Sequence, residues 1–347
     1  MRVLTPNQLT ETCIKIMLAS GVPNDEAQTV ANVLVEANLR GQDGHGALML
    51  PRYLADVKTG RIKFPAKIEI VRESPSSALL NGNWGFGQVI GVKAMELAIN
   101  KAKDHTIGFV GIYNCNHIGM LSHYSMMALN HDMIGFTACN SNPEVAPYGG
   151  RARQLGTNPV CYAIPAGNEK PIVLDMATSV VAAGKIRDKY AKGEKTPEGW
   201  MIDSDGRGTV DPTAFVTPKG SARAMLLPIG GYKGYGLSLI VDALGGALTG
   251  SGCCSTDKKG GHRENGVIMF ALKIDSFTEI AAFKQRIDDE IRSIKSTPTA
   301  PGFEEILISG EPEFRTAEER SRKGIEIPDA TWEALKEAGK EAGVDIE

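Results

Sequence analysis

The chain has 347 residues, 42% of them hydrophobic, which is enough for two or three domains with buried cores. The formal net charge of −3, without a basic stripe, argues against a nucleic-acid partner. No charged-then-apolar leader opens the sequence, and no apolar run approaches the roughly 18 residues of a membrane span. We therefore expect a soluble, cytoplasmic protein that acts on neither membranes nor nucleic acid.

The cysteines and histidines do not form a recognisable metal or disulfide pattern. The adjacent pair Cys253-Cys254 could be redox-active, but a glycine-rich loop from residue 250 to 261 accounts for it more simply. His117, His123 and His131 lack the spacing of metal ligands, so no metal site is expected.

Two helices open the chain, one capped by Thr5 and one starting at Asn24. The glycine-flanked segment that follows, residues 41–53, brings together His45, Arg52 and Tyr53. An arginine supplies a forked donor for a carboxylate, and an imidazole can relay a proton. Taken alone, the segment would fit an ordinary helix start with polar surface groups better than a site.

Strands are expected at residues 68–71 and 78–80, followed by the glycine-rich turn 82–91 and a helix through Lys103. This turn follows a strand and precedes a helix, as the dinucleotide-binding fingerprint does. Its glycines are spaced GxGxxxG, however, and no acidic residue ends a second strand about 20 residues later. We interpret it as a turn and helix start, not as a phosphate cradle.

The central stretch, residues 114–178, carries most of the chemistry-bearing side chains. Short apolar runs at residues 109–112, 133–139, 160–164 and 172–174 predict buried strands that end in polar or glycine-rich residues. In open α/β sheets, ligands bind at the rim where such strands end. His117 also precedes a helical pattern at 119–129, which would set its imidazole beside unpaired helix N–H donors. An anionic substrate could then bind next to a proton acceptor.

The second half is predicted from simpler patterns. We expect helices at residues 179–192, 237–248, 277–295 and 329–342, strands at 267–274 and 303–308, and a loop excursion at 195–228. Lys233 lies at the start of one helix among small residues. It suits a phosphate or a carboxylate, and equally a solvated lysine on a turn.

Six ordered sequence blocks resemble the malate/L-lactate dehydrogenase family, which includes sulfolactate and ureidoglycolate dehydrogenases and piperideine-carboxylate reductases. The blocks run nearly end to end: GHGALMLPRY, NHIGML, LGTNP, DMATS, GYKGYG, and TPTAPGF through SGEPE. The resemblance implies a sulfolactate dehydrogenase-like α/β fold, a non-Rossmann mixed sheet flanked by helices, with a helical N-terminal module. It also implies a homodimer. We expect residues 1–72 to pack with 275–347, and residues 73–274 to form the central cofactor-binding domain.

The resemblance also implies roles for individual residues. His117 is similar to the family's proton acceptor, and His45 falls in a segment that some members use for proton relay. Thr157 looks like a substrate-side residue, beside Arg52 and Tyr53. The residues that resemble cofactor contacts are His117, Ile118, Gly119, Met120, Leu121, Ser141, Asp175, Met176, Ala177, Lys233, Ser309, Gly310 and Glu311.

Two positions depart from the family pattern. Gly44 replaces the usual Ser before His45, so a Ser-His relay cannot operate. Met49 replaces an Arg commonly found there, and Arg52, one helical turn further on, could supply the cation instead.

These residues predict reversible oxidation of a 2-hydroxy acid with a nicotinamide cofactor, malate/oxaloacetate being the first expected substrate. Lactate, sulfolactate, ureidoglycolate and cyclic imines remain alternatives, as does a non-catalytic nucleotide-binding relative. NAD is expected because Glu311 would repel a 2′-phosphate if it faces the cofactor. NADP stays open because Arg315 lies nearby.

Overall fold

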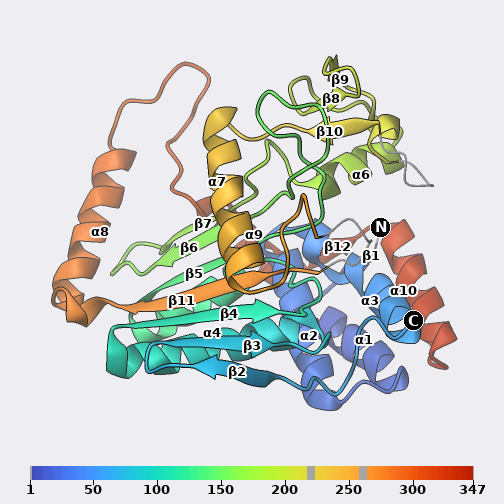
Figure 1. Ribbon diagram of the computed structural model, residues 1–347, viewed down its shortest axis with the longest axis horizontal. Coiled ribbons are helices and arrows are strands. Elements are labelled where there is room, and N and C mark those ends of the chain that lie inside the picture. Colours follow the sequence, from blue (N-terminus) through green and yellow to red (C-terminus); the bar gives the residue numbers. More distant parts are fainter. Residues whose placement is uncertain (1, 217–222, 258–263, 347) are drawn as a thin grey trace.

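The computed structural model describes residues 2–216, 223–257 and 264–346 (Figure 1). Its central layer is a sheet with the strand order β2-β3-β4-β11-β5-β6-β7. The strands are β2 (Glu69–Glu73), β3 (Ser77–Asn81), β4 (Ile107–Tyr113), β5 (Met133–Cys139), β6 (Val160–Ile164), β7 (Ile172–Met176) and β11 (Val267–Lys273). Strands β3 and β4 pair in parallel, and the other neighbouring pairs are antiparallel. The predicted mixed sheet is therefore confirmed.

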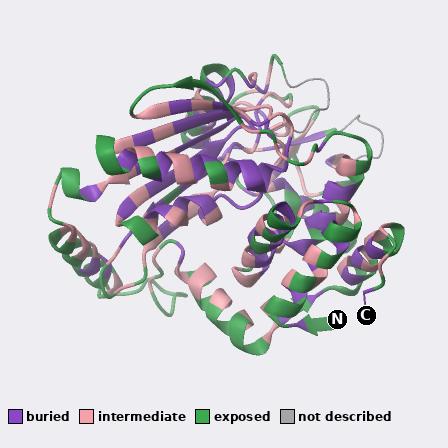
Figure 2. Cartoon of the chain, turned by 90° about the horizontal axis from the view of Figure 1, so that it is seen from below, coloured by how far each residue is buried: buried purple, intermediate pink, exposed green. Residues whose placement is uncertain are grey.

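Helices cover both faces of this sheet (Figure 1). On one face, α4 (Gly87–His105) and α5 (Ser122–Met127) bury the largest apolar cluster of the sheet, which includes Ile90, Met95 and Ile112. On the other face, α7 (Tyr232–Asp242) packs over Phe136 and Ile268. The strands are mostly buried and the helices expose their outer sides (Figure 2), as expected for a sheet between helical layers.

The N-terminal helices form a separate helical layer with the C-terminal end of the chain. These helices are α1 (Pro6–Ala19), α2 (Asn24–Leu39) and α3 (Leu50–Lys58), and they share one apolar core with α10 (Asp329–Glu341). Strand β1 (Arg2–Leu4) pairs with β12 (Ile325–Ile327), which brings the two termini to one side (Figure 1). Helix α9 (Glu311–Lys323) lies against α2. The predicted helical N-terminal module is confirmed.

Helix α8 (Ile280–Lys295) packs differently from the rest of the C-terminal segment. It lies beside the sheet edge in Figure 1, where the Asp288 carboxylate accepts the backbone N–H groups of Gly167 and Asn168, both at 2.8 Å. Residues 325–346 thus pack on the N-terminal helices, whereas α8 packs on the turn between β6 and β7. The division into domains stays a prediction.

The excursion at residues 195–228, predicted as loop, contains a small sheet with the order β10-β8-β9. Its strands are β8 (Met201–Asp203), β9 (Gly208–Thr209) and β10 (Ala224–Leu226), next to α6 (Ala183–Ala191). Residues 217–222 of the excursion, and residues 258–261 of the glycine-rich loop, lie outside the described residues. Strands of two or three residues are too short to show a hydrophobic period, which is why the loop prediction was wrong.

Two other predictions need correction. The strand expected at residues 303–308 is absent from this described segment, which is irregular and exposes Phe303. The helix expected from residue 119 begins only at Ser122, because Gly119 adopts a left-handed conformation with φ of 76°. It ends at Met127, where the 3₁₀ helix Ala128–His131 follows. Within the described part of the chain, no helix is long and apolar enough to span a membrane.

Candidate functional site

The strand directions bring the polar segments of the central stretch to one rim of the sheet. Strands β4 and β5 are both antiparallel to β11 between them, so they run in the same direction and end at the same rim. Strand β3 ends there too, as does β7, while β6 and β11 begin there. The rim therefore carries residues from six strand ends, among them Gln88, His117, Asn140, Ser141, Thr157, Asp175 and Asn265.

His117 lies in a group of three ring side chains at this rim. The hydroxyl of Tyr53 is 2.7 Å from Nδ1 of His117. The imidazole of His45 stacks on that of His117, with 5.4 Å between ring centroids. Tyr53 is a buried residue of α3, and His45 belongs to the short 3₁₀ turn Asp43–His45. The structure therefore brings together three residues that the sequence singled out from two distant segments.

Burial changes the acid–base behaviour of two of these groups. Desolvation lowers the pKa of His45, whose Nδ1 has no hydrogen-bond partner in the described structure. Desolvation also raises the pKa of Tyr53 far above its ordinary value of 10, so the phenol stays protonated at neutral pH. His45 is accordingly an uncharged imidazole at neutral pH, and Tyr53 is an uncharged hydrogen-bonding group.

Hydrogen bonds from neighbouring helices hold the 3₁₀ turn that carries His45. The Arg320 guanidinium of α9 donates to the Asp43 carboxylate at 2.7 Å, and Asn38 donates to the same carboxylate at 2.6 Å. The Asn38 side-chain oxygen in turn accepts the N–H of Ala47 at 2.8 Å. A Cβ at Gly46 would lie 2.3 Å from that oxygen, so only glycine fits there.

Gln88 is a contact of this group that sequence reasoning missed. Its side-chain nitrogen is 2.9 Å from the Tyr53 hydroxyl and 3.3 Å from the backbone oxygen of His117. The residue occupies the first turn of α4, within the glycine-rich stretch 82–91 that we interpreted only as a turn and helix start. An uncharged glutamine in an apolar helical pattern carries no signal of a site, so only the fold reveals it.

The helix expected beside His117 is not there. Helix α5 begins five residues later, and the backbone N–H of Ser122 at its start donates to the Asp175 carboxylate at 2.8 Å. We expected the backbone N–H groups at the start of this helix to face a substrate beside His117. The N–H group of Ser122 instead donates its hydrogen bond to Asp175. The backbone before His117 is held by Asn116, whose side chain donates to the carbonyl oxygens of Trp84 and Gly85 at 2.8 and 3.0 Å.

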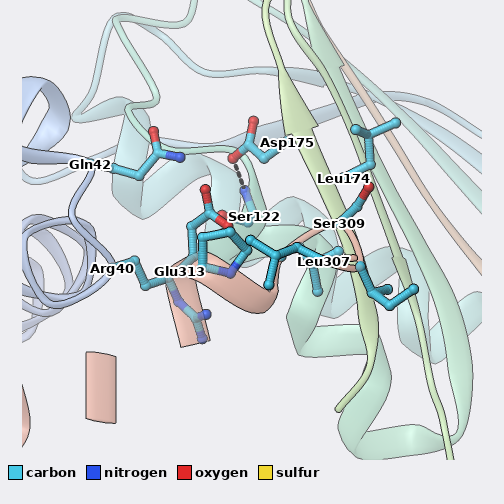
Figure 3. A pocket seen from close by; sticks show the side chains of 12 residues that line it. Arg40, Gln42, Ser122, Leu174, Asp175, Leu307, Ser309 and Glu313 are labelled. Carbon is cyan, nitrogen blue, oxygen red and sulfur yellow. Dashed lines mark hydrogen bonds between the residues drawn. The ribbon is translucent and has the colours of Figure 1, made fainter. Parts of the chain in front are cut away.

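Asp175 lies in a pocket of about 300 Å³ between α2, α9 and β7 (Figure 3). Ser309 and Gly310 line the same pocket, so three of the residues that resemble cofactor contacts meet there. Arg40, Gln42 and Glu313 line it as well, and the sequence did not indicate them. Figure 3 shows Gln42, Asp175 and Glu313 directing polar atoms to one part of the pocket. Burial raises the pKa of Asp175 to about 6.

The Glu311 side chain does not line this pocket. Its carboxylate is held by Lys295 at 2.6 Å, by Arg315 at 2.5 Å and by the N–H of Ile308 at 3.1 Å. Hydrogen bonds from Lys295 and these partners lower the pKa of Glu311 to about 2, against the desolvation that raises it. Glu311 was the residue expected to favour NAD, and Arg315 the residue that left NADP open. In the structure these two side chains form an ion pair with each other, and Glu311 also holds the loop that carries Ser309 and Gly310.

Ser141 and Thr157 form a second group on the rim. The Ser141 hydroxyl accepts the N–H of Thr157 at 3.1 Å. Asn265, buried before β11, joins this group to the His117 segment, because it accepts the N–H of Ile118 at 3.2 Å and donates to Asn140 O at 2.8 Å. The side chains of Ile118, Met120 and Leu121 are buried in the structure.

The remaining predicted site residues are more scattered. Arg52 is half-buried on α3, and Met49 is buried in the core of the N-terminal helices. Lys233 is exposed at the start of α7, and Met176 packs beneath that helix. Ala177 follows the end of β7. Among the described residues, no three His, Cys, Asp or Glu side chains are grouped as metal ligands.

Comparison with known proteins agrees with this architecture. The sequence pattern of the family described as malate/L-lactate dehydrogenase matches residues 4–336. The malate dehydrogenase of Pyrococcus abyssi is 42% identical over 345 residues, covering 97% of this chain and 94% of that protein. The L-sulfolactate dehydrogenase of Methanocaldococcus jannaschii is 40% identical over 348 residues, covering 99% and 98%.

Solved structures give the same answer for the fold. The crystal structure of malate dehydrogenase from Entamoeba histolytica matches with a TM-score of 0.95 at 29% identity, over 99% of each chain. The sulfolactate dehydrogenase from Methanocaldococcus jannaschii matches with a TM-score of 0.89 at 38% identity, over 99% of this chain and 98% of that one. The predicted sulfolactate dehydrogenase-like fold is confirmed, and the chain belongs to the malate/L-lactate dehydrogenase family.

Proposed function

We propose that this protein transfers hydride between a nicotinamide cofactor and a 2-hydroxy acid, with His117 as the proton acceptor. The observation that carries the proposal is the contact between Tyr53 and His117 Nδ1, at the rim that also holds the pocket around Asp175. The buried Tyr53 hydroxyl orients the imidazole of His117 through this contact. A histidine whose ring is held in place by a neighbouring side chain is the usual arrangement of a general acid–base.

The nicotinamide cofactor, when bound, supplies the hydride chemistry. The chain must orient the substrate and manage one proton. In oxidation, His117 takes the proton of the C2 hydroxyl group; in reduction, it returns that proton to the carbonyl oxygen. An imidazole with an ordinary pKa of roughly 6.5 serves both directions near neutral pH. The uncharged His45 lies against His117 and offers a further hydrogen-bonding group beside the substrate.

The pocket around Asp175 fits part of a dinucleotide. Its volume of about 300 Å³ is at the lower end of the range for small-molecule sites. Asp175 and Glu313 offer carboxylates that accept hydrogen bonds from ribose hydroxyl groups and repel a 2′-phosphate. Arg40 lines the pocket too, but its guanidinium is paired with Glu36 at 2.9 Å. These charges support NAD as the preferred cofactor.

Malate/oxaloacetate is the substrate that we propose. The relatives named above act on malate and on sulfolactate according to their names, and both compounds carry a second anionic group beside the 2-hydroxy acid. Arg52, half-buried on α3 next to Tyr53, is the cation that we assign to the substrate carboxylate.

The direct test is oxidation of NADH and NADPH with a panel of 2-oxo acids and a cyclic imine. Rapid consumption of NADH with oxaloacetate, faster than with pyruvate or sulfopyruvate, is the expected result. Preference for the cyclic imine would instead assign imine reduction. Cofactor binding without turnover of any of these compounds would contradict the catalytic proposal.

The family resemblance also supports a homodimer, and α7 offers a surface for it. The outer side of this helix and of the turn after it is apolar, with exposed Leu237, Leu239, Ile240 and Leu248. Several large apolar side chains exposed next to one another usually mark a contact surface. We assign this surface to contact with a second copy of the chain, because two identical apolar surfaces can cover each other in an isologous interface.

A further inference from the structure

Arg40 is a cation in the wall of the pocket around Asp175, and its side chain is only 13% exposed. It directly follows the last residue of α2, where the carbonyl groups at the helix end favour a positive charge. Its Nε donates to the Glu36 carboxylate at 2.9 Å, and its guanidinium lies over the Phe314 ring of α9, 4.8 Å from the ring centroid. These contacts hold the guanidinium in one orientation.

The two NH₂ groups of the Arg40 guanidinium form an edge that the protein does not use. Within the described part of the chain, neither of them donates a hydrogen bond to a protein acceptor. In Figure 3, Arg40 and Gln42 lie on one side of the pocket, and Leu174 and Ser309 lie on the other. A guanidinium that borders a pocket with a pair of donors of this kind is suited to a phosphate group.

The charge of Arg40 is offset by Glu36, a residue outside the lining of the pocket. The Glu36 carboxylate also contacts Nδ1 of His123 on α5, at 2.5 Å. Burial alone would raise the pKa of Glu36, but the hydrogen bonds and charges of His123 and Arg40 outweigh it and lower the pKa to about 2. The carboxylate is therefore ionised at neutral pH, and its negative charge opposes the positive charge that Arg40 presents to the pocket.

We propose that Glu36 is a positioning residue that acts through Arg40 to set the cofactor preference: by neutralising Arg40 it keeps the pocket from accepting the 2′-phosphate of NADP. This inference rests on the proposed function and adds a residue that selects between cofactors without lining their pocket. While the pair of Glu36 and Arg40 is neutral, the carboxylates of Asp175 and Glu313 dominate the pocket and favour NAD. Without the charge of Glu36, Arg40 becomes a ligand for the phosphate.

The end of α2 brings these groups to the pocket. Glu36 and Arg40 are one helical turn apart, so their side chains meet on one face of the helix. The next residue, Gly41, has φ of 74°, a left-handed conformation that ends the helix and directs the chain to Gln42 of the pocket. Helix α9 packs against α2 and supplies Phe314, the ring that lies against the guanidinium. The ion pair is therefore held at the border of the cofactor pocket.

The test compares the full-length protein with Glu36→Gln, which keeps the shape of the side chain and an oxygen for Nε of Arg40 but removes the charge. Binding of NADH and NADPH is followed by fluorescence titration without substrate, so turnover is not needed. In Glu36→Gln we expect the ratio of Kd for NADPH over NADH to fall about five- to tenfold, through tighter binding of NADPH. Adenosine 2′-phosphate should displace NADH more readily from this variant, whereas adenosine should not.

Replacement of Arg40 shows whether the effect acts through this residue. Arg40→Met should weaken binding of NADPH more than binding of NADH, because it leaves the charge of Glu36 beside the pocket. In the double variant Glu36→Gln/Arg40→Met, the gain in NADPH affinity should be absent. Glu319→Gln is the matched control, because it removes an exposed carboxylate of α9 that pairs with Lys323, and it should leave the ratio unchanged.

The outcomes separate this inference from the proposed function. An unchanged ratio of Kd values in Glu36→Gln, with a normal thermal unfolding curve, would overturn the inference and leave the NAD-dependent function in place. The same gain in the double variant or in Glu319→Gln would reject the role of Arg40. A shift of cofactor preference without turnover of any 2-hydroxy acid would reject the proposed function and keep the assignment of Glu36. Binding of neither cofactor would overturn both.

Discussion

The imidazole rings of His45 and His117 lie nearly parallel, with 24° between their planes and 5.4 Å between their centroids. Two imidazoles at this separation oppose each other's protonation, because like charges close together disfavour the second charge. Desolvation lowers the pKa of His45, so His45 is the ring that stays neutral. The proton that enters or leaves during turnover is therefore assigned to His117.

Replacement of His117 by Ala should lower kcat by about 10²–10⁴, the usual contribution of a general acid–base. The affinity for the cofactor should change little, because the pocket around Asp175 is formed by other residues. Steady-state kinetics and fluorescence titration with NADH measure the two effects separately. Removal of the exposed imidazole in His131→Ala is the matched control. A near-normal kcat in His117→Ala would exclude this residue from the role.

Replacement of Arg52 by Ala should raise KM for the 2-oxo acid about 10- to 100-fold, the effect expected for losing a hydrogen bond to a charged group. The KM for the cofactor should stay the same. Arg61→Ala, which removes an exposed arginine beyond the end of α3, provides the control. An unchanged substrate KM in Arg52→Ala would mean that another cation replaces the arginine lost at Met49.

Replacement of Asp175 by Asn should stabilise the protein at pH 7 and weaken cofactor binding. Burial raises the pKa of Asp175 from 3.8 to about 6, so the native state holds more protons than the unfolded state between these values. The stability contributed by the protonated carboxyl is complete below about pH 4 and is lost as the pH rises through 6. Asn keeps an acceptor for the Ser122 N–H and does not titrate.

Thermal unfolding of Asp175→Asn against pH measures this effect. The variant and the unmodified protein should coincide at pH 4 and differ by about 1–2 kcal/mol at pH 7, less than the full shift implies because the side chain keeps some contact with solvent. A difference that is constant across this range would show that the carboxyl does not titrate there.

Replacement of Glu313 by Gln should relax the preference for NAD. The carboxylate lines the pocket beside Asp175, and removing its charge lowers the electrostatic cost of a nearby 2′-phosphate. We expect the ratio of kcat/KM for NADPH over NADH to rise about tenfold, equivalent to about 1.4 kcal/mol. The control is Glu318→Gln on the same helix, whose side chain is exposed and pairs with Lys170. An equal change in both variants would assign the effect to general surface charge.

Replacement of Ile240 by Glu should dissociate the proposed homodimer. The side chain is 57% exposed on the outer side of α7, and a buried, unpaired carboxylate would oppose the contact of two such surfaces. Sedimentation analysis should show a dimer for the unmodified protein and a monomer for the variant. Leu18→Glu, at a 44% exposed position on α1, should remain dimeric. A monomer before any substitution would contradict the assignment of the α7 surface.

Strand and helix positions were largely predictable because they depend on local periodicity. The run 133–139 was predicted and observed with the same limits, as Met133–Cys139, and the sheet is mixed as expected. The failures follow from the same cause: β8, β9 and β10 are too short to show a period, and the irregular segment after Phe303 resembled a strand by composition alone.

The structure brings part of the predicted site together, but with a geometry that differs from the expected one. His45 and Tyr53 both contact His117, as the prediction grouped them. The helix that was expected beside His117 begins at Ser122, and its first N–H group donates to Asp175. Gln88 and Glu313 had no sequence signal, because a glutamine or a glutamate on a helix face is usually a solvated polar residue.

The sequence by itself determined which residues can carry the chemistry, since an imidazole, a phenol and a carboxylate are properties of the residue types. Its apolar runs also predicted the positions of the strands that end just before the polar site segments. Only the tertiary structure decided which nitrogen of His117 is engaged, which carboxylates enter the pocket around Asp175 and which are bound by Lys295 and Arg315. Those outcomes depend on side chains that are far apart in the chain and approach each other only when the strands share a rim.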